Sequence, residues 1–150
     1  MKLILSRHAP QNMDALQALS SEGKKLLGKM IRHLKMEGYA PEYIYASPSL
    51  RTKETAEIIS EAFHCPLEVE EALKRYDAQK LLEIVKAFPQ ETLLFVGHAP
   101  TITEFAQSLV SEPVPEIGLA SALIFRVDKS KRCLISVPIA HITPQGVIQL

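Results

Sequence analysis

Short apolar runs alternate along the chain with segments in which apolar residues recur every three or four positions. The runs predict strands at 3–5, 43–46, 67–70, 92–96, 122–127 and 133–137. The recurring positions predict amphipathic helices, whose inward residues are Leu26, Leu27, Met30, Ile31 and Leu34, then Ala56, Ile59 and Phe63, then Leu81, Leu82, Val85 and Phe88, then Ile102, Phe105, Ala106 and Leu109. This alternation predicts an α/β fold: a three-layer α/β/α sandwich with a mostly parallel central sheet and the last strand pair as an antiparallel edge.

Individual residues mark where the predicted helices begin and end. Ser20 or Ser21 suits the N-cap of the first helix, and Gly38 suits its C-terminal stop. Ser47, followed by a proline, predicts the start of the second helix, because the proline ring fits the first helical turn. Arg51 is therefore expected in the first turn of that helix.

The composition is that of an ordinary globular protein. The 150 residues are 47% hydrophobic, and we expect a single domain over 1–150. The 17 basic and 17 acidic residues cancel, so no global field attracts nucleic acid or an anionic membrane. The sequence contains no apolar run of about 20 residues and no signal-peptide pattern. Cys65 and Cys133 lack metal or disulfide spacing, so we expect reduced, buried cysteines in a cytoplasmic protein.

Two of the predicted strands end in a histidine, and a third leads to an arginine. Arg7 and His8 follow the first apolar run, His98 follows a later one, and Arg51 lies beyond a third. By itself, an N-terminal Arg-His pair is typical of a surface turn. The carboxyl ends of parallel strands share one edge of a sheet, however, so these four side chains can converge there.

Two arginines and two histidines in one pocket favour an anionic ligand, and phosphate above all. Guanidinium groups match phosphate oxygens two at a time. One histidine could attack phosphorus while the other binds an oxygen on which charge develops. Metal binding is the competing interpretation of the two histidines, but two adjacent arginines oppose a dication and no further ligand of matching type is evident. We therefore expect no metal and no cofactor.

These residues lie in blocks that resemble the signature of the histidine phosphatase superfamily, which has a phosphoglycerate mutase-like fold. The blocks are Arg7-His8, Ser47-Pro48-x-x-Arg51-Thr52-x-x-Thr55-Ala56 and Gly97-His98-Ala99-Pro100. Within the superfamily the short chain resembles the SixA-type phosphohistidine phosphatases. The resemblance implies that His8 is the catalytic nucleophile and becomes phosphorylated. It also implies that Arg7, Arg51, His98 and Ala99 bind the phosphoryl group.

Two positions depart from the family pattern. Ala9 stands where the family usually has glycine, and its methyl group could narrow the pocket or alter the local backbone. The sequence Gln17-Ala18-Leu19-Ser20 replaces the frequent Arg-Pro-Leu-Thr, which removes a basic residue near the entrance. This second change argues against a substrate with a second phosphate.

The general acid is not identified by any motif. Larger family members commonly use a glutamate after the second helix, and the candidates here are Glu70, Glu71 and Asp77. Glu71 is the closest match by position, although an exposed carboxylate without a catalytic role is equally typical of such a segment. A phosphohistidine substrate needs less proton donation than an alkyl phosphate, because its leaving imidazole can depart already protonated.

The sequence thus predicts a metal-independent phosphatase that acts on phosphohistidine in a partner protein. Two alternatives stay open. One is a phosphomonoesterase for small molecules such as phosphosugars or nucleotides, and the other is a non-catalytic phosphate-binding module. We expect no nucleic-acid or membrane partner. Substrate specificity should depend on the segments 9–19, 70–80 and 111–121, because binding residues concentrate in loops carried by a rigid scaffold.

Overall fold

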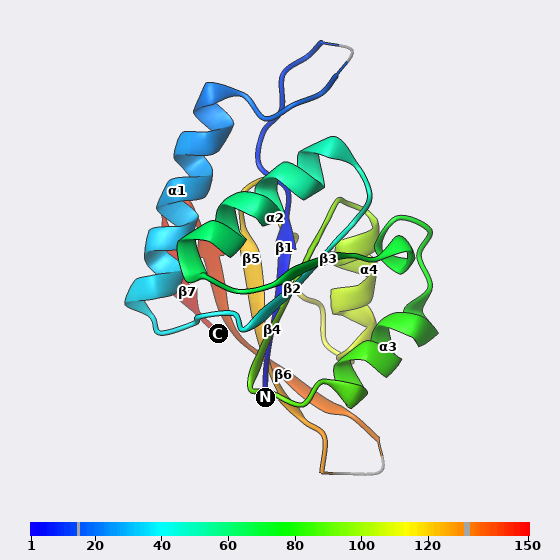
Figure 1. Cartoon of the computed structure of the whole chain (residues 1–150). Coiled ribbons are helices and arrows are strands. Elements are labelled where there is room, and N and C mark those ends of the chain that lie inside the picture. Colours follow the sequence, from blue (N-terminus) through cyan, green and yellow to red (C-terminus); the bar gives the residue numbers. More distant parts are fainter. Residues whose placement is uncertain (15, 131–132) are drawn as a thin grey trace.

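The computed structural model describes residues 1–14, 16–130 and 133–150. Its centre is one twisted sheet with the strand order β3-β2-β4-β1-β5-β6-β7. The strands are β1 (Lys2–Arg7), β2 (Tyr43–Ala46), β3 (Leu67–Val69), β4 (Thr92–Gly97), β5 (Ala122–Asp128), β6 (Ile135–Thr143) and β7 (Gly146–Gln149). Helices flank the sheet on both sides (Figure 1), so the predicted three-layer α/β sandwich is confirmed.

The sheet is half parallel and half antiparallel. Strands β3, β2, β4 and β1 run parallel to one another, whereas β5, β6 and β7 each pair antiparallel with the preceding strand in the sheet order. The prediction of a mostly parallel sheet with an antiparallel edge is therefore only partly correct. The prediction missed β7 and the second half of β6, because this hairpin is half exposed and lacks a continuous apolar run.

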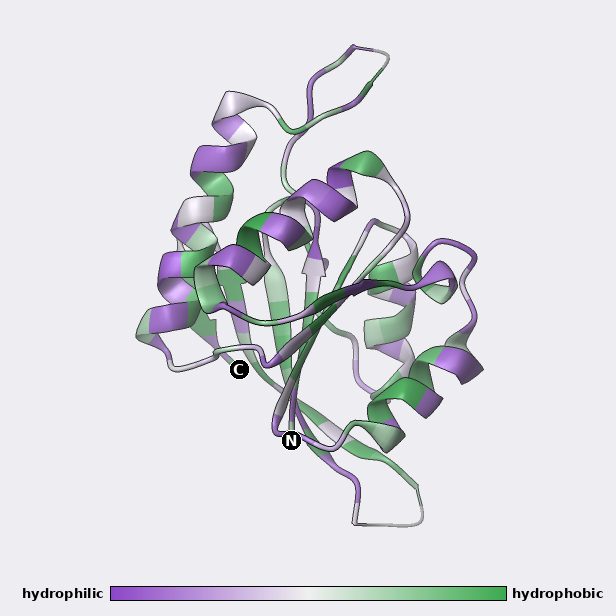
Figure 2. Ribbon diagram, viewed as in Figure 1, coloured by the Kyte–Doolittle hydropathy of each residue, from purple (hydrophilic) through white to green (hydrophobic). Residues whose placement is uncertain are grey.

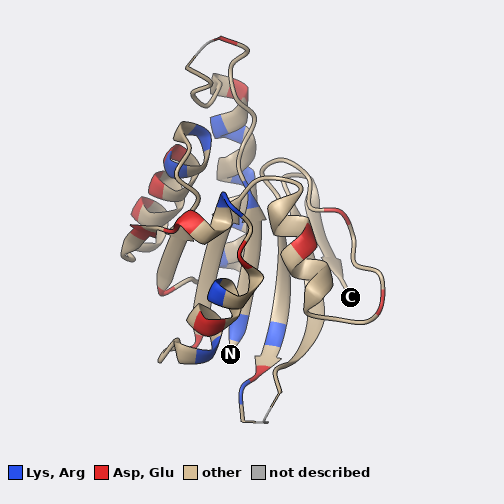
Figure 3. Cartoon of the chain, turned by 90° about the vertical axis from the view of Figure 1, so that its right-hand side faces the viewer, with Lys and Arg blue, Asp and Glu red and all other residues tan. Residues whose placement is uncertain are grey.

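Two helices cover each face. Helices α1 (Ser21–Met36) and α2 (Leu50–Phe63) lie on one side of the sheet, and α3 (Ala78–Ala87) and α4 (Thr101–Ser108) lie on the other. A short 3₁₀ helix, η1 (Glu71–Leu73), precedes α3. Each helix presents hydrophobic residues toward the sheet and hydrophilic residues outward (Figure 2), and the charged residues lie mainly on helices and connecting segments (Figure 3).

The alternation of side chains along each strand supplies both cores. In β1, Leu3 and Leu5 pack under α3 and α4, while Ile4 packs under α1 and α2. The same alternation recurs in β4, where Leu93 and Phe95 face one side and Leu94 and Val96 the other. Because β1 and β4 are buried on both faces, packing holds them rigidly. The residues at the ends of these two strands are therefore held in fixed positions.

Helix boundaries follow the sequence closely, with one correction. Ser20 is the N-cap of α1, as expected, and its side chain accepts a hydrogen bond from the Gly23 N–H at 2.9 Å. The N-cap of α2 is Ser49 rather than Ser47, so the helix begins two residues later than the Ser-Pro signal indicates. Arg51 nevertheless lies in the first turn of α2.

Two further expectations can be compared with the described residues. Cys65 is buried, but Cys133 is exposed, so the prediction of two buried cysteines is wrong for the second. In the part of the chain that the structure describes, none of the helices is long and apolar enough to cross a membrane.

Candidate active site

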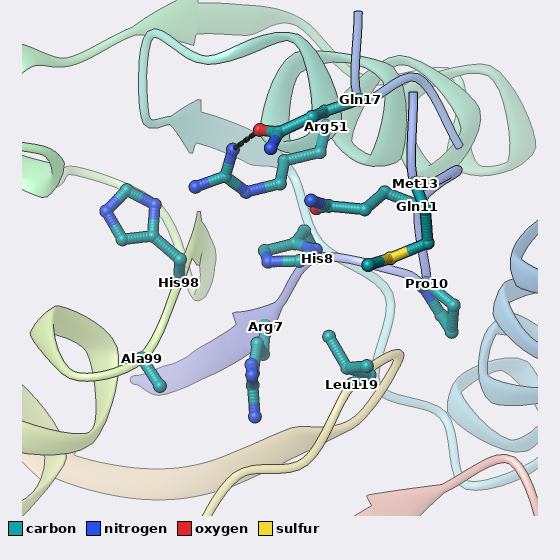
Figure 4. A pocket seen from close by; sticks show the side chains of 10 residues that line it. All are labelled: Arg7, His8, Pro10, Gln11, Met13, Gln17, Arg51, His98, Ala99 and Leu119. Carbon is teal, nitrogen blue, oxygen red and sulfur yellow. Dashed lines mark hydrogen bonds between the residues drawn. The ribbon is translucent and has the colours of Figure 1, made fainter. Parts of the chain in front are cut away.

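A pocket of about 440 Å³ opens where β1 and β4 end and α2 begins. It contains all four side chains that the sequence singles out, and Figure 4 shows Arg7, His8, Arg51 and His98 around one space. Its lining residues are Arg7, His8, Pro10, Gln11, Met13, Gln17, Arg51, His98, Ala99 and Leu119. No motif marks Pro10, Gln11, Met13 or Leu119, but the first three belong to the segment 9–19 and Leu119 belongs to the segment 111–121, both of which are expected to determine specificity.

The parallel register of β1 and β4 brings the two histidines together. Arg7 pairs with Gly97 across the two strands, so the next residues, His8 and His98, leave the sheet side by side. The His8 N–H donates to the Gly97 carbonyl oxygen at 3.0 Å, and the His8 carbonyl oxygen accepts from the Ala120 N–H at 3.0 Å. These two backbone bonds fix His8 between β4 and the segment that precedes β5.

The His8 ring has the tautomer and the protonation state that a nucleophilic imidazole requires. Its Nδ1 atom lies 2.8 Å from the carbonyl oxygen of Ala9, which can only accept, so Nδ1 carries the proton and Nε2 keeps its lone pair. The pKa of His8 is lowered to about 4, chiefly because the ring is buried and further because it lies near Arg51, Arg7 and His98. At neutral pH the imidazole is therefore uncharged, which is the form that can attack phosphorus.

Arg51 extends into the pocket from an unfavourable position for a cation. It lies in the first turn of α2, where the helix dipole repels positive charge, and this turn contains no acidic residue. Its Nη1 donates to Oε1 of Gln17 at 3.1 Å, a neutral partner on the opposite side of the mouth. An anion in the pocket would relieve the repulsion between the guanidinium and the helix terminus.

Arg7 adds a second positive charge to the pocket, and His98 adds a ring nitrogen. Among the described residues, no carboxylate forms an ion pair with either arginine of the pocket, and no lining residue is acidic. Arg7 Nε and His98 Nδ1 are buried, and no described residue forms a hydrogen bond with either atom. The pKa of His98 is lowered by burial first and then by Arg51, Lys74 and Arg7. A phosphoryl group, with several acceptor oxygens, fits this set of donors.

Thr55 couples two parts of the pocket through one hydroxyl group. Its Oγ1 accepts from the Ala9 N–H at 3.0 Å and donates to the Arg51 carbonyl oxygen at 2.8 Å. The side chain is fully buried. These two hydrogen bonds connect Ala9, the residue after His8, to the first turn of α2. The position of His8 therefore depends on the helix that carries Arg51.

The carboxylates considered as general acids do not line the pocket. The Glu71 carboxylate lies 3.5 Å from Arg75 Nε on the exposed side of η1. Glu70 accepts from the Ala72 N–H at 3.0 Å, and Asp77 accepts from the Lys80 N–H as the N-cap of α3. All three make local contacts that hold their own segment, and the role of Glu71 as an acid stays a prediction.

Ala9 and Ser47 lie outside the pocket. The Ala9 side chain is fully buried in the core under α1 and α2, so its methyl group does not narrow the space beside His8. Ser47 is buried as well, and its hydroxyl forms no hydrogen bond with any residue that the structure describes. The expectation that Ser47 caps the second helix is therefore wrong. Gln17, the second departure from the family pattern, lies in the pocket wall with a left-handed backbone (φ 53°).

No group of three or more His, Cys, Asp or Glu residues within the described part of the chain is arranged to hold a metal ion.

Comparisons with known proteins agree with this geometry. The profile of the histidine phosphatase superfamily (branch 1) matches residues 3–81. Among solved structures, the chain is similar to the protein histidine phosphatase SixA complexed with tungstate (21% identity, TM-score 0.85, covering 97% of this chain and 98% of that one). It is also similar to a proposed SixA of Agrobacterium tumefaciens (17% identity, TM-score 0.77, covering 95% and 97%). A mycobacterial glucosyl-3-phosphoglycerate phosphatase shares the fold as well (15% identity, TM-score 0.70, covering 91% and 96%). A search of the curated proteins finds no match.

Proposed function

The chain belongs to the histidine phosphatase superfamily, and from that premise we propose that it is a SixA-type phosphatase that removes phosphoryl groups from phosphohistidine in a partner protein. The observation that carries the proposal is the neutral His8 ring beside two arginines that form no ion pair with a carboxylate of the described residues. The pocket combines a nucleophile with an anion site, and phosphoryl transfer requires both.

In the proposed reaction, Nε2 of His8 attacks phosphorus in line with the departing nitrogen of the substrate. The bond between phosphorus and the substrate imidazole breaks as the bond to Nε2 forms. The substrate imidazole leaves with the electron pair and with its own ring proton. Arg7, Arg51 and His98 hold the phosphoryl oxygens, and water then cleaves the phosphohistidine on His8 to release inorganic phosphate.

The absence of acidic residues from the described pocket lining favours a substrate with a good leaving group. An alkyl phosphate needs a proton donor for its alkoxide, whereas an imidazole leaves as a neutral ring. The phosphohistidine bond therefore suits a pocket whose described side chains supply cations and imidazoles but no carboxyl group.

A small-molecule phosphomonoesterase is the second candidate. Similar folds serve proteins described as a glucosyl-3-phosphoglycerate phosphatase and as an α-ribazole-5′-phosphate phosphatase. Such an enzyme would need a proton donor over the leaving group, and Glu71 is the candidate that the sequence offers. This alternative predicts one strongly preferred phosphate ester.

A substrate screen separates the two candidates. Phosphohistidine carrier proteins, free phosphohistidine and a panel of phosphate esters are compared by kcat/KM, with His8→Ala as the control. The proposal expects the highest kcat/KM for a phosphohistidine protein and no turnover by the variant. A variant with full activity on every substrate would refute the role of His8, and a strong preference for one ester would favour the second candidate. Labelled phosphate retained on His8 after an alkaline quench would identify the intermediate and argue against a mere phosphate-binding module.

A further inference from the structure

The mouth of the pocket carries large apolar side chains that are exposed to solvent. Met13 is 99% exposed, Leu16 is 73% exposed, and Leu50 and Leu119 are 42% and 39% exposed. Met13 and Leu119 line the pocket (Figure 4), and Leu16 and Leu50 are the chain neighbours of the lining residues Gln17 and Arg51. We call these four residues the apolar rim.

The rim extends beyond the body of the protein. The segment between β1 and α1 projects past the ends of the helices (Figure 1), and it carries Met13 and Leu16. Their side chains contribute almost nothing to either core, because both cores consist of other residues. Exposing large apolar groups to water is unfavourable, so a cluster of them around a functional pocket indicates an interaction surface.

The described residues on the two sides of this projection bond to one another. Gln11 forms a bridge with Leu19 across the base of the segment, and the Asn12 N–H donates to the Ala18 carbonyl oxygen at 2.7 Å. Nearer the tip, the Gln17 N–H donates to Oδ1 of Asp14 at 3.0 Å. These contacts join residues 11–14, which include Met13, to residues 16–19, which include Leu16.

We propose that the apolar rim docks the protein that carries the phosphohistidine, by packing against apolar side chains that flank the phosphorylated residue on the partner's surface. This inference rests on the proposed function and adds the residues that recognise the partner. In this proposal Arg7, Arg51 and His98 bind the phosphoryl group, which is common to every phosphohistidine substrate. The rim also includes Leu16 and Leu50, which do not line the pocket, so contact with them requires a substrate larger than phosphohistidine itself.

Contacts made by the apolar rim should affect kcat/KM for the protein substrate and for free phosphohistidine differently. Side chains that contact only the partner protein contribute to kcat/KM for the protein and not for free phosphohistidine. A minority of the residues at an interface, those near its centre, account for most of the affinity that truncation removes. Loss of two rim side chains should therefore lower kcat/KM for the protein substrate about tenfold or more.

The test compares Leu16→Ser/Leu50→Ser, which alters the two rim residues that do not line the pocket, with the wild type on two probes, a chemically phosphorylated phosphohistidine carrier protein and free phosphohistidine. Met36→Ser/Ile148→Ser is the matched control, because Met36 and Ile148 are also apolar and exposed (75% and 56%) but lie away from the pocket. We expect the rim variant to lose about tenfold in kcat/KM on the carrier protein, with free phosphohistidine turned over as by the wild type. The control should match the wild type on both probes.

Other outcomes overturn the inference and identify what failed. Equal losses on both probes would mean that the rim variant distorts the pocket, and unchanged activity on the carrier protein would mean that the rim makes no contact with it. If the wild type hydrolyses free phosphohistidine or esters but no carrier protein, the proposed function fails and the docking surface fails with it.

Discussion

Arg51 donates from Nη1 to Oε1 of Gln17 over 3.1 Å, and this bond joins the first turn of α2 to a residue 34 positions earlier in the chain. In the resembling family the corresponding segment often carries an arginine, whereas here a neutral amide faces the guanidinium. The amide oxygen holds Arg51 across the mouth of the pocket without adding charge. The positive charge of the site is thereby limited to what one phosphoryl group can neutralise.

Replacement of Gln17 should weaken substrate binding or change substrate preference, depending on the residue that replaces it. Gln17→Ala removes the acceptor that orients Arg51, so we expect KM for the preferred phosphorylated substrate to rise about threefold to tenfold while kcat changes less. Gln17→Arg adds a cation at the mouth, and it should improve kcat/KM for substrates with a second acidic group relative to those with one. Steady-state kinetics with a monophosphate and a bisphosphate measure both effects. If the ratio of kcat/KM for the bisphosphate to kcat/KM for the monophosphate were the same in the wild type and in Gln17→Arg, this role for Gln17 would be contradicted.

The lowered pKa of His8 predicts that the free energy of unfolding depends on pH. The ring has a pKa of about 4 in the folded chain and about 6.5 in the unfolded chain, so the unfolded state binds more protons between these values. The free energy of unfolding should therefore rise with pH across this window. The contribution of His8 is fully present above about pH 6.5 and is lost progressively as the pH falls toward 4, by about 3 kcal/mol in all.

Urea denaturation of the wild type and of His8→Gln between pH 4 and pH 7 measures this dependence. The variant should lose stability less steeply as the pH falls, because glutamine does not titrate. It keeps part of the slope, since burial also lowers the pKa of His98 and of His141. Identical slopes for the two proteins would show that His8 titrates alike in the folded and unfolded states.

The Thr55 hydroxyl group should matter for both stability and catalysis. Thr55→Val keeps the shape of the side chain but leaves the buried Ala9 N–H without its acceptor, which should cost about 1–3 kcal/mol in the free energy of unfolding. Because Ala9 follows His8, we also expect kcat to fall. Thr55→Ser retains the hydroxyl group and should recover most of the kcat. If Thr55→Val lowered stability but left kcat at the wild-type value, the coupling between Thr55 and the nucleophile would be refuted.

Ala9→Gly tests whether the alanine at this position serves packing or catalysis. The methyl group is buried in the core under α1 and α2, so its loss should lower the free energy of unfolding by about 1–2 kcal/mol, including the added freedom of the unfolded glycine. The kinetic constants should stay within about twofold of the wild type, because the methyl group does not line the pocket. Thermal denaturation and steady-state kinetics on the same preparation give the two readings. A changed KM at unaltered stability would place the methyl group in the site.

Much of the architecture could be predicted because it depends on local patterns. Apolar runs and helical spacings located β1, β4, α1 and α4, since burial selects for periodicity within each element. Where the pattern was weak the prediction failed, as for the hairpin of β6 and β7. The start of α2 was misplaced because Ser47 and Ser49 both precede a helical segment, and only the capping contacts of Ser49 with Thr52 distinguish them.

The residues that could carry the chemistry can be identified from the sequence alone. Arg7, His8, Arg51 and His98 each lie at the end of a predicted strand or at the start of a predicted helix, and parallel strands direct such ends to one edge. Their protonation states and their surroundings depend instead on the folded structure. The lowered pKa of His8, the bond from Arg51 to Gln17 and the exposed rim all depend on contacts between segments far apart in sequence. Such contacts arise from packing and burial, and no local pattern of residues encodes them.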